Sequence, residues 1–315
     1  MAARGLSLLR VTLLGTSAAQ PTVNRNLSGI AMKADADLVL FDCGEGSQRQ
    51  MARFGVGLDL DAVFFTHFHA DHYLGIIGLL RTLGMQGRDR ALPLYGPAPA
   101  RTLLHSAIHL GIEALTFPVD LIELAPGAEV VRPGYSVHAV AADHRTPALS
   151  YLVVEETRPG RFDVAAATAR GVPSGPLWGQ LQRGQIVTLP DGAQVHPDQV
   201  LGPPRPGRRI AISGDTRPTS ALAEAARGVD LLIHEATFCD DEQARALETR
   251  HSTAREAARI ATAAGARRLV LTHLSSRYDK EPARVAAEAA SEYAGPLVVA
   301  DDGFCIEIDD LATAR

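Results

Sequence analysis

The hydrophobic residues of this chain are gathered into short runs that end abruptly at a polar residue. Continuous runs rich in leucine and β-branched residues are typical of strands that are buried on both faces. Six of these runs are followed within two residues by a histidine or an aspartate. Because strands of one sheet deliver such residues to a common edge, we expect a functional site there. The six runs lie at residues 38–41, 62–65, 135–142, 209–213, 231–233 and 269–272.

Helical patterns lie between several of these runs, and the clearest one covers residues 253–264. Thr253 is suited to cap its N-terminus, Glu256 completes a capping box, and Gly265 is suited to end the helix. Alternation of strands and helices places the chain in the α/β class. The apolar run at residues 11–14 leads into Gly15 and predicts a first strand rather than part of a signal peptide.

The segment from about residue 155 to residue 209 departs from this pattern. It holds eight of the nineteen prolines, a density that suits turns and a protruding arm. We therefore expect a single domain over residues 1–315 with a flexible arm inserted at about residues 155–207. Between residues 157 and 185 the arm carries positive charge, with Asp163 as the one acidic residue against Arg158, Arg161, Arg170 and Arg183. The alternative is a surface insertion without a function.

Composition narrows the class of protein. The 315 residues are 46% hydrophobic, enough for a sizeable core, and the net charge of −5 excludes a general affinity for nucleic acid, so any such contact must be local. Three widely spaced cysteines argue against a disulfide framework and favour a reducing, cytoplasmic location. No apolar window is long enough for a transmembrane helix, so we expect no membrane partner.

The most informative chemistry lies just after the run at residues 62–65, where His67, His69, Asp71 and His72 occur within six residues. Imidazole nitrogen and carboxylate oxygen are ligands that zinc and similar metals prefer. A histidine-rich surface loop is the alternative, but four such groups this close repel or compete with one another unless a metal organises them.

These four residues suit two metal ions better than one. His67 and His69 alternate and can converge on one ion, while Asp71 and His72 can face a second. Two ions need more ligands, and the candidates at other strand ends are His144, Asp215 and His273. A dinuclear site of this kind suits displacement at phosphorus or at an acyl carbon.

The remaining histidines have weaker signals. His138 lies within an expected strand, and His105 and His109 lie four residues apart on an expected helix without an acidic partner, so we interpret all three as structural. His196 is expected to be solvated in the arm. The sequence leaves open whether His234 packs or supports a ligand, and whether His251 is catalytic or part of a helix start.

The ligand run and its downstream partners resemble the metallo-β-lactamase superfamily, which implies an αββα sandwich with a metal site at one edge. Further motifs resemble the ribonuclease Z family of transfer-RNA 3′-processing endonucleases, and they occur in order along nearly the whole chain. They lie at residues 21–26, 41–48, 213–216, 234–238, 251–253 and 271–278, with residues 171–184 resembling the core of that family's RNA-binding arm.

The resemblance implies a role for each candidate residue. His67, His69 and His144 would hold one zinc ion, and Asp71, His72 and His273 a second, with Asp215 bridging the two. Manganese or magnesium could also support activity. Asp71 would orient or deprotonate the attacking water, and His251, with Glu235, would assist proton delivery to the leaving oxygen.

The implied activity is removal of 3′ trailers from precursor tRNA, leaving a 3′-hydroxyl on the tRNA and a 5′-phosphate on the trailer. The arm would grip the tRNA through phosphates, and a homodimer would let one subunit hold RNA that the other cuts. The loop at residues 21–26 lacks a lysine found in many members, and Gln180 and Gln182 replace lysines in the arm. The expected RNA contacts are Arg25, Asn26, Arg158, Arg161, Arg170, Arg183 and Arg277.

Two other functions are compatible with the ligand set. A phosphodiesterase or sulfatase acting on small esters would use the same fold and metals, but it would have no use for an arginine-bearing arm. A non-catalytic RNA-binding protein on a decayed enzyme scaffold is the third possibility, and the apparently complete ligand set argues against it.

Overall fold

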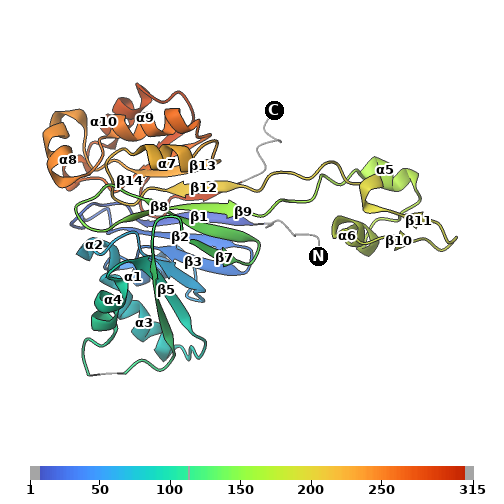
Figure 1. Ribbon diagram of the computed structural model, residues 1–315, viewed down its shortest axis with the longest axis horizontal. Coiled ribbons are helices and arrows are strands. Elements are labelled where there is room, and N and C mark those ends of the chain that lie inside the picture. The colour runs from blue at the N-terminus through green and yellow to red at the C-terminus, as the bar shows by residue number, and fades with distance from the viewer. Residues whose placement is uncertain (1–7, 113, 309–315) are drawn as a thin grey trace.

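Two seven-stranded sheets face each other in the computed structural model, which describes residues 8–112 and 114–308 (Figure 1). The first sheet has the order β16-β1-β2-β3-β4-β5-β6. Its strands are β16 (Cys305–Glu307), β1 (Leu9–Gly15), β2 (Gly29–Ala34), β3 (Asp37–Phe41), β4 (Ala62–Phe64), β5 (Leu92–Pro97) and β6 (Val119–Leu124).

The second sheet has the order β15-β14-β13-β12-β9-β8-β7, and its strands β12 to β15 are parallel. Its strands are β15 (Leu297–Val299), β14 (Leu269–Thr272), β13 (Leu231–Glu235), β12 (Arg209–Ile212), β9 (Leu149–Glu155), β8 (Tyr135–Ala141) and β7 (Glu129–Arg132). β13 continues two residues beyond the expected run, because His234 and Glu235 still pair with β14.

Helices cover the outer face of each sheet, so the fold is the expected αββα sandwich (Figure 1). The first sheet is covered by α1 (Ser47–Arg53), α3 (Gly75–Met85) and α4 (Ala100–Ile108), with the short α2 (Ala70–Tyr73) at one end. The second is covered by α7 (Ser220–Ala225), α9 (Ala254–Ala264) and α10 (Pro282–Ala290), with α8 (Gln243–Thr249) beside them. Single turns of 3₁₀-helix lie at Asp240–Glu242 and Ser276–Tyr278.

The predicted helix start at Thr253 is confirmed. The Thr253 side chain accepts a hydrogen bond from the Glu256 backbone N–H, and the Glu256 carboxylate accepts one from Thr253 in return. Gly265 ends α9 in the left-handed conformation, with φ of 61°. The apolar side of α9 is almost entirely alanine, which lets the helix lie close against the sheet.

Aromatic rings fill the space between the two sheets near the functional edge. Phe64 of β4 stacks on Phe41 of β3 with ring centroids 5.4 Å apart, and Tyr151 of β9 meets Phe64 edge-on at 5.6 Å. The Tyr151 hydroxyl donates to the Phe65 carbonyl at 2.7 Å. This packing ties the strand that precedes His67 to the opposite sheet, so the histidine run begins from a rigid support.

Between β9 and β12 the chain leaves the sandwich and forms a small separate body that extends away from it (Figure 1). Its elements are α5 (Val164–Ala169), α6 (Pro176–Gln182), β10 (Val187–Thr188), β11 (Gln194–Val195) and a 3₁₀ turn at Pro197–Gln199. Val172, Leu181 and Val187 lie in a core of its own. The two connecting segments pair at Arg158 and Arg205, each of whose backbone N–H groups donates to the other's carbonyl at 2.9 Å. We call residues 157–206 the arm.

The arm emerges from the end of the sandwich opposite α2 (Figure 1). β9 runs from Leu149, beside the histidine run, to Glu155 at the arm, a span of about 20 Å for six strand steps. Within the described residues, no helix has both the length and the apolar character needed to cross a bilayer.

Candidate metal centre

The structure brings three histidines and one aspartate together at the end of β4. His67 Nε2 lies 3.0 Å from His69 Nδ1, and His144 Nε2 lies 3.1 Å from the same atom. Asp215 Oδ2 lies 3.5 Å from His67 Nε2 and 3.9 Å from His144 Nε2. The four atoms come from three separate strand ends and converge on one point.

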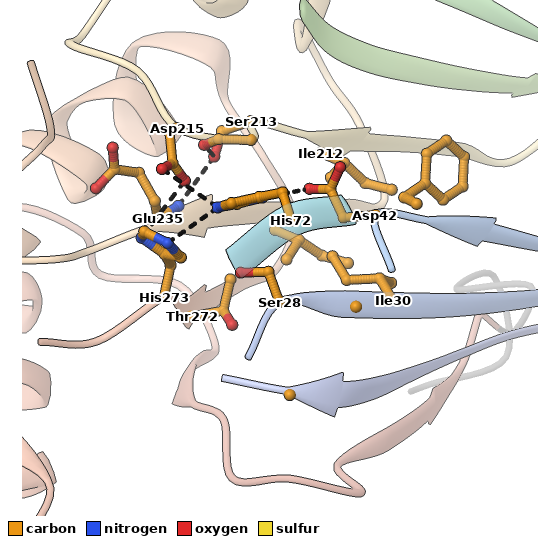
Figure 2. Close-up of a pocket in the computed structure, with 15 residues that line it drawn as sticks. Ser28, Ile30, Asp42, His72, Ile212, Ser213, Asp215, Glu235, Thr272 and His273 are labelled. Carbon is orange, nitrogen blue, oxygen red and sulfur yellow. Dashed lines mark hydrogen bonds and ion pairs between the residues drawn. The ribbon is translucent and has the colours of Figure 1, made fainter. Parts of the chain in front are cut away.

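A second group lies directly beside the first. His72 Nε2 lies 3.2 Å from His273 Nε2, and Asp71 Oδ2 lies 3.5 Å and 3.4 Å from these two nitrogens. Asp215 Oδ2 also lies 3.3 Å from His72 Nε2. One oxygen of Asp215 therefore faces ligand atoms of both groups, which is the position of a bridging carboxylate. Figure 2 shows Asp215 beside His72 and His273 of the second group.

The spacing of these atoms fits zinc. Four ligands held about 2.0–2.1 Å from one zinc ion in a tetrahedron lie about 3.3–3.4 Å from one another. The distances within the two groups run from 3.0 to 3.9 Å. Imidazole nitrogens and carboxylate oxygens that face one another at these distances are arranged as the ligands of a metal ion are. The residues present thus fit a pair of metal ions.

In four of these histidines, the ring nitrogen that points away from the metal groups, called here the outer nitrogen, lies beside an oxygen partner. His72 Nδ1 lies 2.7 Å from Asp42 Oδ2, as Figure 2 shows, and His144 Nδ1 donates to the Arg250 carbonyl at 2.9 Å. His273 Nδ1 donates to Thr237 Oγ1 at 2.9 Å. His67 Nδ1 lies 3.1 Å from Thr66 Oγ1. Such partners fix the ring tautomer and direct the Nε2 lone pair toward the metal.

Burial and neighbouring charges set the protonation states. Burial lowers the pKa of His67, His69 and His144, and nearby histidines lower that of His67 and His69 further, so these rings are neutral as ligands must be. Against the effect of burial, surrounding histidines hold the pKa of Asp215 well below its usual range. His72 differs: burial opposes its charge, but Asp215 and Asp42 raise its pKa well above the ordinary value. A divalent cation between His72 and Asp215 would take the place of that proton.

The backbone at the site is strained. Asp42 and His273 both have positive φ, 60° and 58°, which costs non-glycine residues of order 1–3 kcal/mol each. Asp42 is held there because its Oδ1 accepts the Thr66 N–H at 2.7 Å, and its Oδ2 accepts the Thr66 hydroxyl at 2.8 Å. Strained backbone of this kind persists where surrounding contacts hold it, and it often occurs at functional sites, where it sets the direction of a side chain.

A small cavity of about 30 Å³ lies behind His72, Asp215 and His273, between the two sheets (Figure 2). Its far wall is apolar and includes Ile30 and Ile212. The metal-facing groups thus have apolar side chains on one side, where electrostatic interactions are stronger than in water.

His251 and Glu235 lie beside the second group. Glu235 Oε1 lies 3.0 Å from His251 Nδ1, and Glu235 Oε2 accepts the Thr237 hydroxyl at 2.6 Å. Burial opposes the charged form of His251, but Glu235 and Asp215 raise its pKa to about 9. Glu235 is only 1% exposed, and the exposed side of this pair is the His251 ring. The expected role of Glu235 together with His251 stays a prediction.

One expected RNA contact is corrected by the structure. Arg25 is only 3% exposed, and its guanidinium donates to Thr16 Oγ1, the Ala300 carbonyl and Asp301 Oδ1. It fixes the loop at residues 17–26 and is not free to contact RNA. Buried polar partners, which local sequence does not reveal, explain the difference at Arg25. Asn26 is partly exposed, its side-chain amide donates to the Glu45 carbonyl at 2.8 Å, and its role as an RNA contact stays a prediction.

The other expected RNA contacts differ in exposure. Arg161, Arg170 and Arg183 are exposed on the arm, which extends away from the sandwich (Figure 1). Arg158 is partly buried at the base of the arm, 3.4 Å from Glu155. Arg277 is exposed and lies 3.5 Å from Glu242.

The remaining histidines lie outside the two groups. His138 pairs with Ser136 on β8, and His105 and His109 lie on and just after α4. His196 is exposed in the arm. His234 is fully buried on the side of β13 away from Glu235. The sequence left open whether His234 packs in the core or supports a metal ligand, and this position favours packing.

Sequence reasoning did not assign four groups that support the site. These are Asp42, Thr237, Thr66 and the Arg250 carbonyl, which lie beside the outer nitrogens of His72, His273, His67 and His144. Asp42 carried a usable signal, since it ends an apolar run as the ligands do. Thr237 and Arg250 carried no such signal. A threonine hydroxyl or a backbone carbonyl in a loop has the same sequence pattern whether or not a metal ligand lies beside it.

Comparison with known proteins gives consistent matches. Residues 38–171 and 188–274 match the model of the beta-lactamase superfamily domain. Ribonuclease Z of Myxococcus xanthus is 65% identical over 303 residues, which cover 96% of this chain and 99% of the relative. Ribonuclease Z of Haloferax volcanii is 45% identical over 301 residues, or 95% of each chain.

Solved structures agree with these relatives. The short form of human tRNase Z superposes with a TM-score of 0.66 and 26% identity, covering 95% of this chain and 99% of that one. A metallo-beta-lactamase fold protein from Bacillus subtilis gives a TM-score of 0.69 at 21% identity, covering 96% and 100%, and supports the fold alone.

Proposed function

Because this chain belongs to the ribonuclease Z family within the beta-lactamase superfamily, we propose that it is an endoribonuclease that removes 3′ trailers from precursor tRNAs. The cut leaves a 3′-hydroxyl on the tRNA and a 5′-phosphate on the trailer. The single observation that carries the proposal beyond the family is the convergence of seven metal-ligand side chains on two adjacent points, with one carboxylate oxygen between them.

The proposed metals are two zinc ions per subunit, with manganese or magnesium as possible substitutes. His67, His69 and His144 hold one ion, and Asp71, His72 and His273 hold the other, with Asp215 shared. Bound metal ions supply Lewis acidity toward the phosphate and lower the pKa of a coordinated water. The neutral state of three of these rings and the ionised state of Asp215 support this assignment.

Two side chains handle protons in the proposed reaction. Asp71 orients the attacking water and accepts its proton, and its Oδ2 is fixed by a hydrogen bond from the Ala19 N–H at 2.8 Å. His251 gives a proton to the departing 3′-oxygen of the tRNA. The pair of Glu235 carboxylate and His251 imidazole, 3.0 Å apart, supports this role because the carboxylate favours the protonated ring.

The proposed RNA contacts on the arm are Arg161, Arg170 and Arg183, with Arg158 at its base and Arg277 near the metal centre. Contacts of arginine with phosphate do not depend on sequence, which suits an enzyme that must accept many tRNAs. We also propose a homodimer acting in the cytoplasm. The arm leaves from the end opposite the metal centre (Figure 1), which favours an arrangement where one subunit's arm holds RNA cut by its partner.

The test is cleavage of a 3′-extended precursor tRNA by purified protein, with the product ends mapped. We expect one cut after the discriminator base, abolished by a chelator, restored by added zinc and absent from Asp71→Ala. Hydrolysis of a small activated phosphodiester by the same preparation reports whether the metal centre is intact. Loss of tRNA cleavage with that hydrolysis retained would contradict the proposal and favour a small-ester hydrolase.

A further inference from the structure

We propose that Arg217 is a positioning residue that holds His251 in place to protonate the leaving oxygen. This inference rests on the proposed function, because it assumes the role given there to His251. It assigns a task to an arginine that binds neither metal group and does not face the substrate.

Arg217 makes a forked contact with Glu256. Its two terminal nitrogens, Nη1 and Nη2, donate to Glu256 Oε2 and Oε1, the first at 2.8 Å. Nη1 also donates to the backbone carbonyl of His251. Both side chains are largely buried, 14% and 12% exposed, so water screens the pair only weakly. The guanidinium thus fixes a carbonyl of the residue whose imidazole acts in the reaction.

Glu256 is itself fixed at the start of α9. Its Oε2 accepts the Thr253 N–H at 2.9 Å as part of the capping box. The guanidinium of Arg217 therefore binds both the first turn of α9, through Glu256, and the backbone carbonyl of His251. Ser252 adds a third link, since its hydroxyl donates to the Thr216 carbonyl at 2.6 Å.

The segment that carries Arg217 begins at the shared metal ligand. Asp215 precedes it by two residues, and the Thr216 N–H donates to Glu235 Oε1 at 2.9 Å. The Arg217 N–H donates to the Asp143 carbonyl at 2.8 Å, immediately before the ligand His144. Residues 215–217 thus join the metal ligands to the loop at residues 250–253, and Arg217 is the side chain that makes this link to His251.

Several contacts aim the His251 ring. Glu235 Oε1 and Thr237 Oγ1 lie 3.0 and 3.3 Å from Nδ1, and the ring lies 5.0 Å from that of His144 and 5.5 Å from that of His273. These contacts fix the rotation of the ring, whereas the backbone of His251 is held at its carbonyl by Arg217 and at its N–H by the Ala246 carbonyl, 2.9 Å away. Arg250, just before it, has φ of 57°, a strained state that persists only while surrounding contacts hold it. Without Arg217 the loop can relax, and displacement of the donor by about 1 Å can cost roughly 10²-fold in rate.

The chemistry of the leaving group separates this role from a merely structural one. In tRNA cleavage the P–O3′ bond breaks, water supplies the new P–O bond, and the proton from His251 ends on the 3′-oxygen. In bis(p-nitrophenyl) phosphate the departing p-nitrophenolate needs no proton, because its charge is delocalised into the ring and nitro group. Loss of a positioned proton donor therefore slows the first reaction more than the second.

The experiment compares Arg217→Gln with the wild type on precursor tRNA and on bis(p-nitrophenyl) phosphate, with zinc content measured. We expect tRNA cleavage to fall roughly 10²-fold more than hydrolysis of the activated diester, the lower end of a general acid's contribution. Arg217→Lys keeps the positive charge but cannot make the two-nitrogen contact with Glu256. Its tRNA cleavage should therefore lie between that of Arg217→Gln and that of the wild type. Adding Arg217→Gln to His251→Ala should cost little more than His251→Ala alone.

The matched control is Arg132→Gln. Arg132 also makes a forked contact, with Asp37, and is 15% exposed, but it lies on β7 and is not part of the metal centre. It should lower stability without changing the ratio of the two activities. An equal fall of both activities in Arg217→Gln, or an additive loss in the double variant, would overturn the role of Arg217. The proposed function would not be affected by either result. If the wild type hydrolyses the diester but never cuts tRNA, the proposed function fails and the inference fails with it.

Discussion

At the scale of single residues, the metal centre depends on partners that bind no metal. Asp42 shows this most clearly. It is 5% exposed, its backbone is strained, and its carboxylate holds both His72 Nδ1 and the Thr66 peptide. An oxygen partner of this kind orients the ligand and raises its basicity.

Replacing Asp42 with Asn should therefore weaken metal binding without removing a ligand. The loss of the carboxylate charge beside His72 should lower zinc affinity roughly 10- to 100-fold. Competition with a chromophoric chelator measures the affinity. Asp61→Asn is the control, because Asp61 also binds a backbone N–H, that of Leu38 at 2.8 Å, but lies at the other end of the strands. Equal affinities in the two variants would contradict this role for Asp42.

Arg25 gives a second prediction at this scale. Arg25→Gln should lower the free energy of unfolding by roughly 1–3 kcal/mol, because the Thr16 hydroxyl and Ala300 carbonyl lose a charged donor inside the protein. Urea denaturation measures this change. Binding of precursor tRNA by folded protein should hardly change, whereas the exposed Arg170→Gln should weaken binding and leave stability unaltered. The reverse pattern would restore Arg25 as an RNA contact.

At the scale of elements, short turns after strands place the ligands. Gly214, between β12 and Asp215, has φ of 58°, and a Cβ added there would lie 2.7 Å from Thr66 Cβ. The turn after β12 and the turn after β4 thus touch where they deliver Asp215 and His67. A side chain larger than hydrogen at this position would push Asp215 and His67 apart.

Gly214→Ala should accordingly cost both stability and metal. Gly265→Ala is the matched control, because Gly265 has φ of 61° but no atom within 4 Å of an added Cβ. The control isolates the backbone penalty, which is about 1–2 kcal/mol. We expect Gly214→Ala to cost more than the control in thermal unfolding of the metal-free protein, and it alone should reduce zinc content. Similar losses in both variants would show that the close contact relaxes freely.

At the scale of the whole molecule, the arm and the metal centre occupy opposite ends of the sandwich (Figure 1). Arg158 and Arg205 pair through their backbones, so the arm can be removed beyond them without separating β9 from β12. A variant with residues 159–204 replaced by a short glycine–serine turn should keep the sandwich and its metals.

This deletion should abolish cleavage of precursor tRNA at physiological salt and spare hydrolysis of a small phosphodiester. If Arg161, Arg170 and Arg183 each contact one phosphate, the slope of log affinity against log salt should fall by roughly 2–3. Replacing the three arginines with glutamine in the full-length chain is the control, and it should reproduce the change in slope. Retained tRNA cleavage, or equal loss of both activities, would contradict a role for the arm in RNA binding.

The sequence by itself determined the class of fold and the candidate ligands. Buried strands, the capping box at Thr253 and the run from His67 to His72 are local patterns, because burial, helix ends and ligand spacing are set by residues close in the chain. The seven candidate ligands could be predicted for the same reason, since four of them follow strand ends and the other three, His69, Asp71 and His72, lie within the run. Strand ends of one sheet share an edge.

Only the tertiary structure decided which polar groups serve each other across the fold. It placed Arg25 inside the protein and joined Asp42 to His72. It also brought Arg217 to the carbonyl of His251, 34 residues further along the chain. The physical reason is that a buried charge or hydroxyl needs a hydrogen-bond partner close in space. That partner can lie anywhere along the sequence, so the local sequence does not identify it.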